Sequence, residues 1–236
     1  MLQRLYDRVT KKLPAPLAGR LDYSLKPSYR TPLGGPLNGQ QQRQRIVREL
    51  AARIPFDEVV ETGTFRATTT SYFSYLFGVP VTTVEAHPRY YAYSRRILQM
   101  HPDVTPRFGD SRAALRALAA RPSTNNRTVF FYLDAHWNED LPLHEEVEII
   151  RGTWSRAVVL IDDFKVEGDE GYGFDDYGPH KRLALEILPE LPGWGTFFPQ
   201  APSSQETGAR RGSVLLASPD LVREVSDVRS LRRYTA

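Results

Sequence analysis

Two nearly uninterrupted apolar runs most constrain the fold of this 236-residue chain. Residues 128–134 read TVFFYLD, and residues 157–162 read AVVLID. Runs of this kind are typical of central parallel strands, which are buried on both faces. A sheet built around two such strands must be covered on each side, so we expect an α/β fold with helices on both faces.

Shorter apolar runs alternate with segments of helical periodicity around these two strands. Because strands and helices alternate, we expect parallel strands joined by right-handed crossovers. Two late segments, WGTFF at 194–198 and GSVLLAS at 212–218, predict an antiparallel edge joined by a hairpin-like loop. The expected fold is therefore α/β and Rossmann-like, with a seven-stranded, mostly parallel sheet, helices on both faces and an antiparallel edge strand. The further strands are expected at 57–61, 81–85 and 104–108, and the helices at 41–53, 66–77, 88–100, 111–120, 142–151 and 180–190.

The chain divides into two parts by composition. Residues 1–40 hold a short helix candidate and then the Pro- and Gly-rich stretch KPSYRTPLGGPLNGQ, which predicts an irregular arm. Such an arm is expected to act as a lid or as a dimer contact. The regular α/β pattern begins at Gln41, so residues 41–236 are expected to form a single domain.

Composition excludes several classes of protein. There is no cysteine, so disulfides, thiolate metal sites and cysteine nucleophiles are ruled out. The formal net charge is only +3 and the arginines are scattered, which argues against nucleic-acid binding. No apolar run approaches the roughly 20 residues that span a bilayer, and the N-terminus lacks an export signal. We expect a cytoplasmic protein without a membrane span, and a homodimer as its oligomeric state.

An acid stands at the end of each expected parallel strand. In open α/β sheets, ligands bind at the carboxyl ends of the strands. Five acidic positions in register at that edge are hard to explain structurally, because burying unpaired carboxylates is costly. A structural alternative for the last two acids is helix capping combined with an ion pair. The acids are Glu61, Glu85, Asp110, Asp134 and the pair Asp162 and Asp163.

The first turn, ETGTFRATTT at 61–70, lacks the three glycines of a dinucleotide-binding loop. Only Gly63 is present, and Glu61 would repel a phosphate group. This turn favours a ligand that carries an amine and no phosphate. Glu85 ends the next strand 24 residues later, where an acid can accept hydrogen bonds from both hydroxyls of a ribose.

The ordered segments VVETGTFRATTT, VTTVEAHP, FGDSRAAL, FYLDAHW and VVLIDDF resemble the successive motifs of class I S-adenosylmethionine-dependent methyltransferases. The resemblance covers roughly residues 40–217 and implies that 41–236 is a class I methyltransferase domain. Phe65 stands where this family often has a second glycine. The implied cofactor residues are Glu61, Gly63 and Thr64 for the methionine portion, Glu85 for the ribose, Asp110 and Ser111 for the adenine, and Asp134 beside them.

Within the class, LDAH followed by IDDF is similar to the metal-dependent sugar O-methyltransferases of the macrocin and mycinamicin type. The resemblance implies that Asp134, Asp162 and Asp163 bind a metal. Three converging carboxylates repel one another unless a cation lies among them, and oxygen ligands without cysteine favour Mg²⁺. The resemblance also suggests an actinobacterial, for example mycobacterial, polysaccharide O-methyltransferase of the methylmannose type.

Methyl transfer to a hydroxyl requires its deprotonation, by a metal together with a general base. The imidazoles close to Asp134 are His136 and His144, and we favour His144 as the base. Each of them has a structural alternative as a capping residue or as a residue that orients a metal ligand. The aromatic residues Trp137, Tyr172 and Tyr177 are candidates for stacking on a sugar, although the loop GYGFDDYG is equally readable as a surface loop or a lid.

Three functions remain open from the sequence. The first is a Mg²⁺- and S-adenosylmethionine-dependent O-methyltransferase that acts on a small-molecule sugar or glycoside. The second is the same fold acting on a catechol or another phenol. The third is a non-catalytic ligand-binding relative, which would not need the three metal-binding acids or the histidine.

Overall fold

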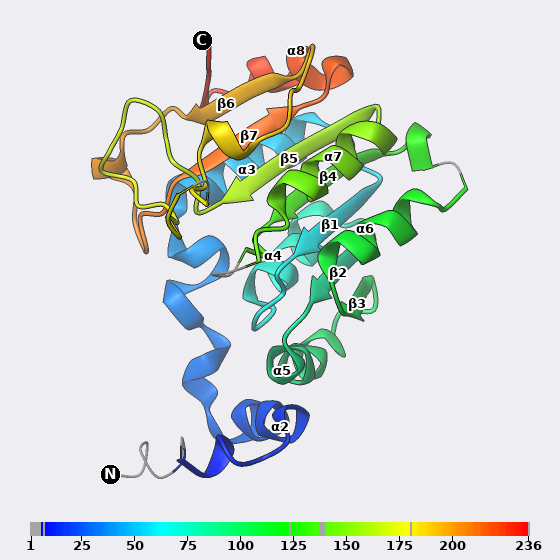
Figure 1. The fold of residues 1–236 in the computed structure, drawn as a ribbon, viewed down its shortest axis with the longest axis vertical. Coiled ribbons are helices and arrows are strands. Elements are labelled where there is room, and N and C mark those ends of the chain that lie inside the picture. The colour runs from blue at the N-terminus through cyan, green and yellow to red at the C-terminus, as the bar shows by residue number, and fades with distance from the viewer. Residues whose placement is uncertain (1–5, 7, 123, 137–139, 180, 236) are drawn as a thin grey trace.

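The computed structural model describes residues 6, 8–122, 124–136, 140–179 and 181–235. Its centre is an eight-stranded sheet with the order β3-β2-β1-β4-β5-β7-β6-β8 (Figure 1). The first five strands in this order are parallel to one another, whereas β7 pairs antiparallel with β5 and forms an antiparallel edge with β6 and β8. The expected Rossmann-like fold is confirmed, with one strand more than expected. The strands are β1 (Glu58–Thr62), β2 (Val81–Glu85), β3 (Val104–Phe108), β4 (Thr128–Leu133), β5 (Arg156–Asp162), β6 (Gly195–Pro199), β7 (Ser213–Ala217) and β8 (Leu231–Arg233).

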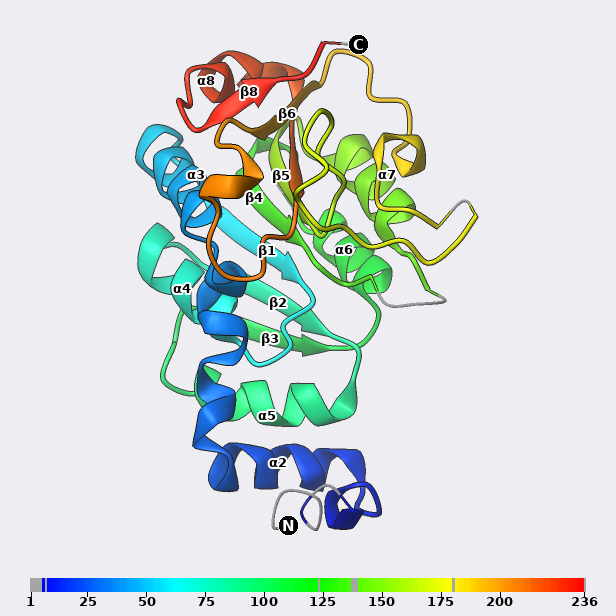
Figure 2. The ribbon, with the colours of Figure 1, turned by 90° about the vertical axis from the view of Figure 1, so that its left-hand side faces the viewer.

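Helices cover both faces of the sheet, as the two central apolar strands require (Figures 1 and 2). Buried residues of α3, α4 and α8 belong to the core on one face, and buried residues of α6 and α7 belong to the core on the other. Among the described residues, no helix is long and apolar enough to cross a membrane. The helices are α2 (Ala15–Leu25), α3 (Gln41–Arg53), α4 (Thr68–Phe77), α5 (Pro88–Leu98), α6 (Ser111–Ala119), α7 (Leu143–Thr153) and α8 (Val222–Ser226).

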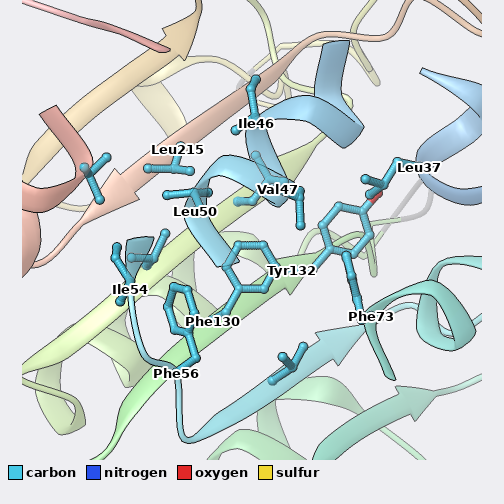
Figure 3. Close-up of a cluster of buried hydrophobic side chains, with 14 of the residues drawn as sticks. Leu37, Ile46, Val47, Leu50, Ile54, Phe56, Phe73, Phe130, Tyr132 and Leu215 are labelled. Carbon is cyan, nitrogen blue, oxygen red and sulfur yellow. The ribbon is translucent and has the colours of Figure 1, made fainter. Parts of the chain in front are cut away.

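The position of strand β4 between two cores explains why its sequence is almost entirely apolar. Alternate side chains of a strand point to opposite faces. Phe130 and Tyr132 therefore pack into the core beneath α3 and α4, while Phe131 and Leu133 pack into the core beneath α6 and α7. Figure 3 shows Phe130 and Tyr132 beside Leu50 of α3. Every residue of β4 is buried, and Asp134 lies at the carboxyl edge of the sheet because it directly follows the last residue of this strand.

The segment that precedes α3 runs from α2, which lies alongside α5, up the molecule toward the sheet (Figure 2). It forms three short 3-10 turns, Pro27–Arg30, Pro32–Gly34 and Pro36–Gly39. Its end is anchored at the carboxyl edge. Leu37 is fully buried and its N–H donates to Thr69 Oγ1 at 3.0 Å, and Asn38 Nδ2 donates to Asp162 Oδ2 at 3.4 Å.

The helix expected at 180–190 is not formed. In the described residues of this range there is only a 3-10 turn, Leu185–Ile187, and His180 lies outside the described residues. The backbone here pairs with the preceding loop instead: Leu183 N–H donates to Asp175 O at 3.0 Å, and Tyr177 N–H donates to Lys181 O at 3.0 Å. Because these groups are used by the loop, they are not available for a helix.

Candidate active site

Three side chains from the two segments that follow β4 and β5 meet at the carboxyl edge. Asp134 directly follows β4, His136 lies two residues later, and Asp163 directly follows β5. Each offers one ligand atom, and these three atoms all lie within 4.8 Å of one another. His136 Nε2 and Asp134 Oδ1 are 4.0 Å apart. We call these three residues the acidic cluster.

His136 is the buried member of the acidic cluster, with 3% of its surface exposed. Neither ring nitrogen has a hydrogen-bond partner in the described part of the chain. Burial lowers the pKa of this imidazole to about 4, so the ring is uncharged at neutral pH. A buried imidazole with two unpartnered nitrogens is an unusual feature, because buried polar atoms are normally paired.

The two carboxylates of the acidic cluster disfavour each other's ionisation. Burial and the charges of Asp162 and Asp163 raise the pKa of Asp134 well above its usual value. Burial and Asp162 raise the pKa of Asp163 to about 7, against the opposing effect of Arg211, whose Nε donates to Asp163 Oδ1 at 2.6 Å. A divalent cation would relieve this repulsion, and two carboxylates with one imidazole are a chemically suitable set of ligands.

Asp162, expected as a metal ligand, lies outside the acidic cluster. Its side chain is fully buried and its oxygens accept hydrogen bonds from the Arg43 guanidinium, the Tyr132 hydroxyl and its neighbour's backbone N–H. The physical reason is that a fully buried carboxylate needs a counter-charge and hydrogen bonds. The geometry therefore brings together Asp134, His136 and Asp163 where the sequence grouped Asp134, Asp162 and Asp163.

Arg43 is a residue that sequence reasoning missed. It lies on the buried face of α3 together with Ile46, Val47 and Leu50, and 2% of its surface is exposed. Besides Asp162, its guanidinium donates to the carbonyls of Arg211 and Gly212. An arginine at helical spacing within an apolar stripe was the available signal, since charged residues are almost never fully buried without a partner.

The first turn places the expected methionine-binding residues next to the acidic cluster. Glu61 is buried, with Oε2 accepting from the hydroxyls of Thr70 and Thr83. Its Oε1 has no partner among the described residues. Burial raises the pKa of Glu61 to about 7. Thr64 is also buried, with its hydroxyl 2.6 Å from that of Thr83.

Glu85 lies on the other side of this turn, at the end of β2. Its two carboxylate oxygens accept the backbone N–H groups of Phe65 and His87, each at 2.7 Å. Burial raises the pKa of this carboxyl, against the effect of these hydrogen bonds. The first turn and the end of β2 are thus held together, and each carboxylate oxygen keeps a further lone pair that could accept a ribose hydroxyl.

Gly63 is required by a close approach of two chain segments. Its φ is +89°, and a Cβ at this position would lie 2.2 Å from the carbonyl oxygen of Asp134. No side chain fits there without a shift of the backbone. The absence of a side chain at Gly63 therefore allows the first turn to pack directly against the backbone of Asp134 in the acidic cluster.

We expect Gly63→Ala to lower the free energy of unfolding by about 1–3 kcal/mol more than Gly78→Ala, as measured by urea denaturation. Gly78 is the matched control because its φ is also positive, +62°, while a Cβ there would meet nothing within 4 Å. An equal decrease in the free energy of unfolding of the two variants would show that the close approach to Asp134 does not contribute to stability.

The residues expected to bind adenine have clear structural partners. Asp110 caps α6, accepting from Ala113 N–H at 3.1 Å, and forms an ion pair with Arg112 at 2.5 Å. This ion pair and the cap lower the pKa of Asp110. Ser111 is buried at the first position of α6. A role of either residue toward adenine stays a prediction.

The residues expected to act as the general base or to contact a sugar lie in different environments. His144 has 50% of its side chain exposed, and its Nδ1 lies 2.9 Å from Ile187 O. Tyr172 is a core residue whose hydroxyl donates to Ala201 O at 3.0 Å, so its ring is not presented as a stacking surface. Tyr177 is half-buried and its hydroxyl lies 3.5 Å from His136 O. Trp137 lies outside the described residues.

Comparisons with known proteins identify the fold. No family model matches the chain, and no curated protein matches it. An O-methyltransferase from Bacillus cereus in complex with S-adenosylhomocysteine aligns with a TM-score of 0.53 and 16% identity over 75% of this chain and 80% of that chain. A cofactor-bound protein from MTB aligns with a TM-score of 0.55 and 20% identity over 88% and 91%.

A third solved structure gives the same result. An O-methyltransferase from Streptomyces achromogenes, which is involved in tomaymycin synthesis and is in complex with S-adenosylmethionine, aligns with a TM-score of 0.52 and 15% identity over 75% of this chain and 79% of that chain. The likeness shows that the chain has the Rossmann-like methyltransferase fold.

Proposed function

We propose that the protein is an S-adenosylmethionine-dependent O-methyltransferase that uses a divalent cation to methylate a hydroxyl of a sugar or glycoside. The observation that carries this proposal is the contact between Gly63 and the carbonyl of Asp134. It puts the turn expected to bind the methyl donor directly beside the acidic cluster. Methyl donor and acceptor hydroxyl must meet in such a place for an in-line transfer.

The chain offers suitable partners for each part of the cofactor. The unpartnered Oε1 of the buried Glu61 is suited to accept a hydrogen bond from the amine of the methionine portion. Gly63 and Thr64 would line the turn beside it. Glu85 would accept the ribose hydroxyls, Asp110 and Ser111 would border the adenine, and Asp134 would lie between cofactor and cation.

The cation is proposed to bind Asp134, His136 and Asp163. The uncharged imidazole of His136 and two carboxylates that repel each other form a fitting set of ligands. Mg²⁺ is the expected ion, and the imidazole nitrogen makes Mn²⁺ a suitable probe. When bound, such an ion would lower the pKa of a hydroxyl beside it. The role of His144 as a general base stays a separate prediction, tested by the turnover of His144→Ala.

The acceptor is inferred from the resemblance to sugar O-methyltransferases, with Tyr177 beside His136 as the aromatic candidate in the described chain. Methylation of a catechol or phenol is the alternative, because the same three residues of the acidic cluster would serve either acceptor. A panel of glycosides and catechols offered with S-adenosylmethionine and Mg²⁺ separates the two.

Calorimetry with S-adenosylhomocysteine tests the proposed function. The wild-type protein is expected to bind it, and Glu61→Gln is expected to weaken binding roughly 10- to 100-fold, since a hydrogen bond to a charged group contributes about 1.5–3 kcal/mol. Glu190→Gln, an exposed substitution of the same kind, is the control. Failure of the wild-type protein to bind S-adenosylhomocysteine would refute the methyltransferase proposal.

A further inference from the structure

A pocket of about 270 Å³ lies between the N-terminal segment, the first turn and the start of α5. It is separate from the acidic cluster, but it shares the first turn with the proposed cofactor site. We call it the basic pocket. Its lining residues are Thr10, Lys11, Tyr29, Arg66, Arg89 and Tyr90.

The basic pocket carries an excess of positive charge. Three of its six lining residues are cationic and none is acidic. Arg89 is neutralised by the buried Asp22, to which its Nε and Nη2 donate at 2.6 and 2.8 Å. Lys11 and Arg66 form no ion pair with any described residue. Two uncompensated cations in a concave site attract an anionic group.

Arg66 is held in place by aromatic rings. Its guanidinium lies 3.6 Å from the ring centroid of Tyr29 and 4.7 Å from that of Phe65. The Phe65 ring in turn packs edge-on against Tyr90, with centroids 4.7 Å apart. Stacking of this kind orients a guanidinium while leaving its N–H groups free to donate. Arg66 is therefore preorganised to bind a carboxylate or a phosphate group.

We propose that the basic pocket binds a phosphate or carboxylate group of the molecule that is methylated, so that the acceptor is an anionic sugar derivative. The inference rests on the proposed function and adds the charge of the acceptor. Two segments connect the pocket with the acidic cluster. The first turn contains both Arg66 and Gly63, and the segment from Tyr29 to Asn38 ends at Asp162, the chain neighbour of Asp163 of the acidic cluster.

Calorimetric titration with inorganic phosphate and with glucuronate tests this proposal on the full chain. Wild-type protein is expected to bind at least one of these probes, and which one binds identifies the anionic group. Arg66→Gln and Lys11→Gln are each expected to weaken that binding about tenfold, as expected for loss of a charge-assisted contact. Arg223→Gln is the matched control, because Arg223 is an exposed arginine on α8, at the opposite end of the molecule (Figure 2).

A second readout separates the basic pocket from the cofactor site. Affinity for S-adenosylhomocysteine is expected to change less than about twofold in Arg66→Gln, and saturating S-adenosylhomocysteine should not displace the probe. The proposal is overturned if wild-type protein binds neither probe, if Arg223→Gln weakens binding as much as Arg66→Gln, or if S-adenosylhomocysteine displaces the probe. Wild-type protein that binds phosphate but not S-adenosylhomocysteine would instead refute the proposed function.

Discussion

Replacing Arg43 by methionine is expected to lower the free energy of unfolding by about 3–5 kcal/mol, because removal of one partner leaves a buried charge uncompensated. Both Arg43 and Asp162 are fully buried and bound to each other. Burial disfavours the charged form of Arg43, yet Asp162 and its neighbours raise the pKa of the guanidinium. The pair thus stays ionised inside the protein, and each member depends on the other.

Urea denaturation followed by circular dichroism measures this loss. Arg48→Met, an exposed substitution on the same helix, is the control and is expected to change stability by less than about 0.5 kcal/mol. Adding Asp162→Asn to Arg43→Met should recover part of the loss, since the uncompensated charge is then removed. Stability of Arg43→Met within about 1 kcal/mol of wild type would mean that Asp162 does not depend on this partner.

Removal of the imidazole in His136→Ala is expected to weaken Mn²⁺ binding at least about 100-fold. Loss of a residue that only supports a metal ligand already costs about 10–100-fold in affinity, and His136 is proposed as a direct ligand. The unpartnered ring nitrogens and the 4.0 Å separation from Asp134 are the basis for this expectation.

Calorimetry with Mn²⁺, in the absence of any acceptor, provides the measurement. His144→Ala is the matched control, because His144 hydrogen-bonds to Ile187 and is half-exposed on α7. Thermal melting of both variants shows whether they remain folded. Mn²⁺ affinity that is the same in His136→Ala and wild type would contradict the proposed ligand set and favour ligands among the carboxylates alone.

Much of the architecture follows from local patterns in the sequence. The apolar runs at 128–134 and 157–162 predicted the two central strands within one residue at each end. The reason is that hydrophobic periodicity and chain direction are local properties, and they decide which strands are buried and where they end. The acids at the carboxyl edge follow from the same argument, because parallel strands end on the same side.

Other features were predicted wrongly or missed because contacts between distant parts of the chain determine them. The segment 181–190 has residues compatible with a helix, but its backbone hydrogen-bonds to the loop at 175–177. Strand β8 has only three residues and is formed through pairing with β6. Tyr172 was a candidate for contact with a sugar, and packing put it in the core.

Local patterns in the chain were enough to predict the Rossmann-like sheet, the helices on both faces and the row of acids at the carboxyl edge. Which of these acids meet depends on contacts between distant segments: Asp134 and Asp163 lie with His136, while Asp162 is paired with Arg43. Asp162 and Asp163 are neighbours in the chain, yet Asp162 is buried against Arg43 of α3, whereas Asp163 belongs to the acidic cluster. Burial of a charge depends on the partners that distant segments bring to it, and no local pattern contains that information.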